Sequence, residues 1–217
     1  YLAMSAFYSE PDGIPEAVVL MLWKFQANLE EEESRLAITR LERRALVSVQ
    51  GKSPSRRIRF HEFQIGYLRN ERPVDKSSHS MIVAAYQSLF PGGWHTVASD
   101  DYFHSWISVH LHRGGMEDEL ELMLTDFKTL QAILDVTDVY RLLSNCFGEM
   151  ESETLRLIRA ALDLSSSVLA TDKAQLASHL IGRLLDRQET GIVDLCKDAA
   201  AFRRTAWLRP LTRSAER

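Results

Sequence analysis

Apolar residues recur every three or four positions across most of the stretch between residues 76 and 202. This spacing gathers them on one side of an α-helix, whereas a strand would alternate apolar and polar residues. Gly-containing breaks such as residues 91–93 and 113–115 separate the periodic segments. Because the connections are short, neighbouring helices should pack antiparallel, and the pattern predicts an all-α array of roughly seven helices.

The residues before this array follow a different order. Pro15 suits the first turn of a helix that continues to about residue 26. The run "EEEESRLAITRLERRA" (30–45) has acids at its start and arginines at its end, as the helix dipole favours. The side of this second helix that should be buried contains Leu36, Ala37, Leu41 and Ala45.

Two alternating segments, "ALVSVQ" (45–50) and "RRIRFH" (56–61), flank the turn-forming stretch "GKSPS" and predict a β-hairpin. A winged helix-turn-helix unit has this layout: helices come first, a hairpin follows, and a further helix comes after it. The expected fold class is therefore mainly α: a winged helix-turn-helix domain with a small β-hairpin, followed by an all-α helical array. The charged, Pro-containing stretch "NERPVDK" marks the boundary between them. We predict a winged-helix domain over residues 1–71, a helical arm domain over 72–204 and a linker or tail over 205–217.

Composition excludes several classes of protein. Apolar residues make up 45% of the 217 residues, enough for a substantial core, and no apolar run is long enough to cross a bilayer. Cys146 and Cys196 lack metal-ligand spacing and predict free thiols in a reducing compartment. We therefore expect a cytoplasmic protein with no membrane partner. The net charge of −4 is not typical of a protein that binds polyanions.

No complete active site is visible in the sequence, so we do not expect this chain to be an enzyme. Gly51-Lys52-Ser53 resembles the end of a phosphate-binding loop, but that loop needs a glycine at position 46, which is Leu46. His104, His110 and His112 cannot all face one metal ion from a single helix. The simpler hypothesis is a packed His110 with His104 and His112 exposed, and no metal site.

A winged helix often binds DNA, and the predicted wing offers Lys52, Arg56, Arg57 and Arg59 as phosphate contacts. The helix that would enter the groove, however, begins with four glutamates at positions 30–33. Their repulsion from phosphate argues against DNA as a partner. A DNA-binding regulator with a helical effector or dimerisation domain nevertheless stays open as the alternative.

His61 stands at the junction between the second strand and the helix that follows it. One hypothesis is that the residue simply caps that helix. The other is that its imidazole contacts an anion held by a neighbouring domain, because a helix start presents free N–H groups in the same direction. Glu62, in the first turn, suits the dipole of the same helix.

Four ordered segments resemble one family. They are "LAMSAFYSEPDGIPEAVVLMLW" (2–23), "LERRALV" (41–47), "FHEFQIGYL" (60–68) and "DDYFHSWISVHLHRGGMEDELELMLTDFKTLQAIL" (100–134). Together they resemble the winged-helix and helical-arm region of NB-ARC/STAND signalling ATPases of the apoptotic protease-activating-factor type. Phe60 and Glu62 depart from the family's motif, which has Met or Leu before the histidine and Asp after it.

The resemblance implies a nucleotide-binding core upstream of this chain, with ADP or ATP as its ligand and none expected on these residues alone. By motif position, His61 would contact the β-phosphate of ADP. Exchange for ATP would release the arm and permit self-assembly, and a WD-repeat sensor would follow the tail. The expected function is thus a non-catalytic regulatory lever that couples nucleotide state to arm movement and oligomerisation. A helical adaptor without a nucleotide role is a third possibility.

Overall fold

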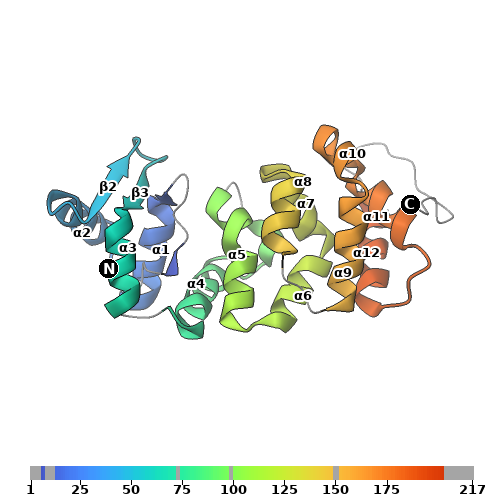
Figure 1. Cartoon of the computed structure of the whole chain (residues 1–217), viewed down its shortest axis with the longest axis horizontal. Helices are drawn as coiled ribbons and strands as arrows, with labels where there is room; N and C mark the ends of the chain where they lie inside the picture. The colour runs from blue at the N-terminus through green and yellow to red at the C-terminus, as the bar shows by residue number, and fades with distance from the viewer. Residues whose placement is uncertain (1–5, 8–12, 72–73, 98–99, 149–151, 203–217) are drawn as a thin grey trace. The chain divides into compact units, whose positions relative to one another are not determined.

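The chain folds mainly into α-helices. A computed structural model describes residues 6–7, 13–71, 74–97, 100–148 and 152–202. Within these ranges it contains twelve α-helices and one three-stranded antiparallel sheet (Figure 1). The predicted fold class, mainly α with a small β-hairpin, is confirmed. The chain divides into two compact units, one of residues 1–91 with 113–115 and the other of residues 92–112 with 116–217.

The sheet belongs to the first unit and has the order β1–β3–β2. Strands β2 (Val47–Gln50) and β3 (Arg57–Phe60) form the predicted hairpin, with Val47 opposite Phe60. Strand β1 (Ile14–Pro15) pairs with the other edge of β3. We did not predict β1, because two residues are too few to show an alternating pattern.

Three helices surround this sheet in the first unit, and a fourth follows them. They are α1 (Glu16–Ala27), α2 (Glu31–Arg43), α3 (Glu62–Glu71) and α4 (Lys76–Leu89). Helix α1 packs against both α2 and α4. The buried apolar residues of α1 and α4 include Val18, Val19, Leu22, Trp23, Ile82, Val83, Ala85 and Tyr86. The core of this unit is therefore built by helices from both ends of its sequence.

The prediction of which side of α2 is buried is wrong. Leu36 is 52% exposed, and Ala45 lies beyond the helix with a left-handed backbone (φ 55°) and is also exposed. Ser34 and Ile38 face the interior instead. The helix is therefore rotated relative to the prediction, because Ile38 supplies the buried anchor and a serine can be buried beside it.

The predicted boundary between residues 71 and 72 falls next to residues 72–73, which the structure does not describe. Helix α4 belongs to the same compact unit as the sheet. The division at 71/72, and the tail over 205–217, stay predictions.

The second unit contains the rest of the helical array. Its elements are η2 (Trp94–Thr96), α5 (Asp101–Gly114), α6 (Glu117–Thr125), α7 (Phe127–Val136), α8 (Val139–Arg141), η3 (Leu142–Cys146), α9 (Glu153–Asp163), α10 (Ser166–Thr171), η4 (Lys173–Gln175), α11 (Leu176–Leu184) and α12 (Thr190–Ala201). More helices form than the predicted seven, because several periodic segments are interrupted. Asp126 ends α6 and caps α7, and a π-helical turn follows α8.

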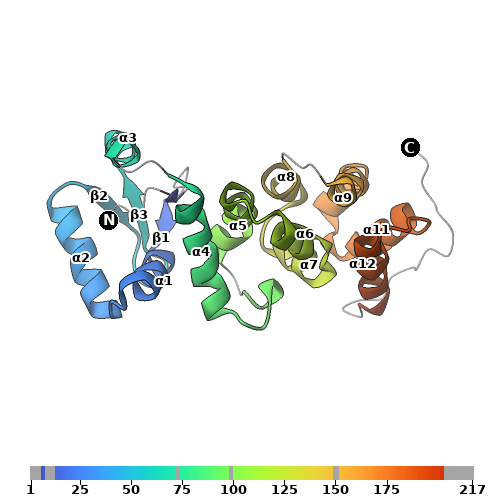
Figure 2. The ribbon, with the colours of Figure 1, turned by 90° about the horizontal axis from the view of Figure 1, so that it is seen from below.

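Helix α12 contacts α6, α7, α9 and α11, so the last helix closes the core of this unit. Its buried residues Ile192, Leu195 and Ala199 face that core. Figure 1 shows α9, α11 and α12 as neighbours, and Figure 2 gives the same neighbours after a quarter turn. Among the described residues, none of the helices combines the length and apolar character that a bilayer crossing requires.

Candidate functional site

His61 lies between the end of β3 and the first turn of α3, at the predicted junction of strand and helix. Its backbone carbonyl accepts hydrogen bonds from the N–H groups of Gln64 (2.8 Å) and Ile65 (3.3 Å). The side chain is exposed. The residue thus caps α3 through its backbone, and its imidazole is left accessible to a ligand or to another protein surface. The side chain of Glu62 lies outside the part of the chain that the structure describes.

The outward side of α3 is apolar, which is unusual for a surface helix. Phe63 is 91% exposed and Tyr67 is 59% exposed, and the two lie one helical turn apart. Gly66 lies beside them, and a Cβ at this position would meet no atom within 4 Å. Leu68, on the opposite side, is fully buried. We name His61, Phe63, Gly66 and Tyr67 the α3 outer face.

Sequence reasoning missed this exposed aromatic pair. The sequence shows two apolar stripes on α3, one with Phe63 and Tyr67 and one with Ile65 and Leu68. A helix that is apolar on two sides either is buried all round or keeps one side for another surface. This signal was present in the sequence, but only the structure shows which stripe is exposed.

Cationic side chains lie at the same end of the hairpin as the α3 outer face. Because Val47 is opposite Phe60, the turn that leads from α2 into β2 lies at the end where His61 follows β3. Arg43 ends α2 and Arg44 begins that turn, and both are exposed. Within the described residues, no carboxylate forms an ion pair with either guanidinium. Arginine is also favoured at a helix C-terminus by the dipole, so a structural role alone would explain its presence.

The wing is less available to a nucleic acid than its sequence suggested. Arg56 pairs with the buried carboxylate of Glu16 at 3.1 Å, and Arg57 donates to the carbonyl of Gly13 at 3.0 Å. Arg35 approaches Glu16 from α2 at 3.6 Å. The base of the wing is thus fixed to α1 and α2 through one acid, which sequence reasoning did not identify.

The predicted arrangement of the three histidines is partly wrong. His110 is packed as expected, with Nε2 at 3.0 Å from the hydroxyl of Tyr102. His104 was expected to be exposed but is only 2% exposed, because its side of α5 faces the core. Burial lowers the pKa of His104 to about 4. His112 is partly exposed and lies 2.9 Å from Glu117. In the described ranges, no three His, Cys, Asp or Glu residues are placed to hold a metal ion.

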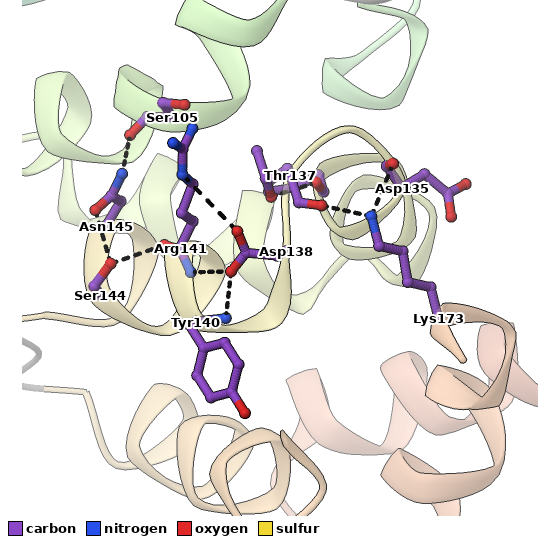
Figure 3. Close-up of polar contacts among 10 residues, drawn as sticks. Ser105, Asp135, Thr137, Asp138, Tyr140, Arg141, Ser144, Asn145 and Lys173 are labelled. Atoms are coloured by element: carbon purple, nitrogen blue, oxygen red, sulfur yellow. Dashed lines mark hydrogen bonds and ion pairs between the residues drawn. The ribbon is translucent and has the colours of Figure 1, made fainter. Parts of the chain in front are cut away.

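Polar contacts in the second unit stabilise helix ends. Figure 3 shows Asp138 accepting the backbone N–H groups of Tyr140 and Arg141, both at 2.9 Å. The ammonium of Lys173 donates to the carbonyls of Asp135 (3.2 Å) and Thr137 (2.5 Å) at the end of α7 (Figure 3). These contacts satisfy groups that helix ends leave without partners. This cluster is therefore structural and offers no separate ligand site.

The α3 outer face combines an accessible imidazole, two aromatic rings and nearby guanidinium groups. Such groups can hold an anion and contact a flat apolar surface.

No protein-family model matches the chain, and no curated protein matches it. The resemblance to NB-ARC/STAND signalling ATPases therefore rests on the four quoted segments and stays a prediction.

Proposed function

We propose that this chain is the non-catalytic regulatory lever of a nucleotide-switch protein of the NB-ARC/STAND type. In this proposal the α3 outer face docks on a nucleotide-binding core that lies upstream in the longer protein. His61 then faces the phosphates of ADP bound to that core. The observation that carries the proposal is the accessible imidazole of His61 beside the 91% exposed ring of Phe63.

The exposed aromatic pair supports a protein partner more than a purely structural role. Leaving a phenylalanine in water forgoes the stabilisation of about 1.5–3 kcal/mol that full burial of such a side chain provides. Aromatic residues are enriched in the centres of protein interfaces. A partner surface that covers Phe63 and Tyr67 would also bring a bound anion within reach of His61.

Arg43 and Arg44 support an anion near the same surface. They are placed at the same end of the hairpin as His61. A diphosphate carries several acceptor oxygens, and guanidinium groups bind such oxygens well. Loss of the anionic ligand, or its exchange for ATP, would then weaken the docking. The helical arm would be released, which permits self-assembly, and a WD-repeat sensor after the tail would receive or impose the motion.

A cytoplasmic location is part of the proposal. Cys146 and Cys196 are both free, in agreement with a reducing compartment.

The test is the release of ADP from the longer protein that contains the upstream core. His61→Leu removes the proposed phosphate contact and should speed ADP dissociation about 10–100-fold, which corresponds to the loss of a hydrogen bond to a charged group. The same variant should shift the protein toward larger assemblies in size-exclusion chromatography. His112→Leu is the matched control, because His112 is a partly exposed histidine that lies in the second unit. Unchanged ADP dissociation in His61→Leu contradicts the proposal.

A gel shift on duplex DNA tests the alternative of a DNA-binding regulator. Tight binding that weakens steeply with salt would favour it. Ion pairs occupy Lys24 (with Glu30, 2.5 Å), Arg35 (with Glu31, 2.8 Å) and Arg56 (with Glu16). The glutamates at the start of α2 would in addition repel phosphate. We therefore expect no specific shift.

A further inference from the structure

A cavity of about 480 Å³ opens between the last two helices of the second unit, α11 and α12. These helices lie side by side (Figures 1 and 2). Seven of its nine lining residues are apolar or weakly polar: Ile181, Leu184, Leu185, Val193, Cys196, Ala200 and Ala201. The other two are Arg187 and Lys197. We call this cavity the α11–α12 groove.

The groove exists because α12 is apolar on two sides. One side, with Ile192, Leu195 and Ala199, is buried in the core. The other side contributes Val193, Cys196, Lys197, Ala200 and Ala201, which recur at the three- and four-residue spacing of one helix face. Val193 on this second side is 45% exposed. The small side chains of Ala200 and Ala201 leave the hollow.

The charge of the groove has one sign. Arg187 and Lys197 are its charged lining residues, and no carboxylate lines it. In the described part of the chain, neither forms an ion pair. The neighbouring acids Asp186, Asp194 and Asp198 are exposed and are not among the lining residues. An occupant with carboxylates at its edges would thus complement the groove.

The residues that follow α12 do not suit this groove. Residues 203–217 contain five arginines and one glutamate. Arginines so close to Arg187 and Lys197 would repel them. An apolar lining likewise disfavours a nucleic-acid backbone, which needs cations along its whole length.

We propose that the α11–α12 groove binds an acidic amphipathic helix of a partner protein. From Val193 to Ala201 the axis of α12 rises by about 12 Å, at about 1.5 Å per residue. This length matches roughly two turns of a partner helix. Apolar side chains of the partner fill the space above Ala200, and its carboxylates pair with Arg187 and Lys197. This site is independent of the α3 outer face and of the nucleotide proposal.

The test uses the 217-residue chain and three synthetic peptides. The first has leucines at positions i, i+3, i+4 and i+7 with glutamates at their flanks. The second replaces the glutamates by lysines, and the third scrambles the first. Fluorescence anisotropy of the labelled peptides should show binding of the first and at least about tenfold weaker binding of the other two.

Variants of the chain place the binding in the groove. Ala200→Trp fills the hollow and should weaken binding of the acidic peptide at least about tenfold. Lys197→Glu, on an exposed position that should not affect folding, leaves Arg187 facing one new carboxylate and should remove the preference for the acidic peptide over the lysine peptide. Lys128→Glu, an equal charge reversal on the exposed side of α7, is the matched control and should leave binding unchanged.

Three results would overturn the proposal. They are equal binding of the acidic and basic peptides, no binding of the acidic peptide, and self-association of the chain that Ala200→Trp abolishes. The last result would assign the groove to a second copy. Circular dichroism of each variant confirms that it is folded before its binding is compared.

Discussion

Glu16 is an acid enclosed by the first unit, at 3% exposure. Arg56 from the base of the wing and Arg35 from α2 both approach its carboxylate. Its backbone N–H also donates to the carbonyl of Arg56 at 2.9 Å. A buried carboxylate needs such partners, because desolvation without them is costly. One residue at the start of α1 therefore holds both the wing and α2.

Replacing this acid should destabilise the first unit. Glu16→Gln removes the charge that two guanidiniums share, and we expect the free energy of unfolding to fall by about 1–3 kcal/mol. The loss stays below that of a fully buried pair, because Arg35 and Arg56 are partly exposed and can turn to water. Urea denaturation measures the change. Glu32→Gln, at an exposed position of α2, is the control, and an equal loss in both variants would contradict this role for Glu16.

His104 is the residue whose environment differs most from the prediction. Neither ring nitrogen makes a hydrogen bond of ordinary geometry among the described residues, although the backbone of Val97 lies near the ring. Burial lowers its pKa from 6.5 to about 4, while the backbone of Val97 and the charge of Asp101 act in the opposite direction. The folded state therefore prefers the neutral ring.

Stability should depend on pH through this histidine. A folded-state pKa below the unfolded value means that stability is complete above about pH 6.5 and is lost as the pH falls toward 4. The loss reaches about 3 kcal/mol by pH 4. His104→Leu should remove most of this slope in denaturation experiments at several pH values. Part of the slope should persist, because burial also lowers the pKa of His79 and His179. An unchanged slope in His104→Leu would show that the ring is not the cause.

At the scale of elements, α3 has two sides with opposite roles. Leu68 anchors it to the core, while Phe63 and Tyr67 face outward. The helix is short, and at its start the carbonyl of His61 accepts the backbone N–H groups of Gln64 and Ile65. Its position is therefore set by the buried side, and the outer side is free to serve another surface.

Two substitutions on α3 should lower the free energy of unfolding by different amounts. Leu68→Ala creates a cavity and should lower the free energy of unfolding by about 2–5 kcal/mol. Phe63→Ser removes a ring that is already in water and should change the free energy of unfolding by less than about 0.5 kcal/mol. Thermal and urea unfolding of the 217-residue chain measure both. A large loss in Phe63→Ser would mean that the ring is packed, and the α3 outer face would no longer support a docking surface.

Some elements could be predicted because their cause is local. The β2–β3 hairpin follows from alternation and turn residues, and the junction at His61 follows from the change of period. The rotation of α2 could not be predicted, since the choice between Leu36 and Ile38 as the buried residue depends on distant partners. The same holds for β1, which pairs with residues more than forty positions away.

At the scale of the whole molecule, periodicity predicted an all-helical array but not its number of helices. The breaks at Asp126 and at the π-helical turn depend on side-chain capping and on contacts such as the hydrogen bond of Asn145 with the carbonyl of Ser105 (3.1 Å). Of the candidate site, the sequence predicted the position of His61 but not its exposed aromatic neighbours. The α11–α12 groove also went unpredicted, because the periodicity of α12 does not show that its second side lacks a covering helix.

Gly66 has a consequence for anyone who redesigns this protein. Glycine within a helix is less favourable than alanine by about 0.5–1 kcal/mol, and here an added methyl group would meet open space. A thermostability screen on the isolated chain would therefore select alanine at this position. The same methyl group would stand between the α3 outer face and any domain that approaches it closely. Selection for heat resistance alone would thus tend to erase the close approach on which the proposed docking depends.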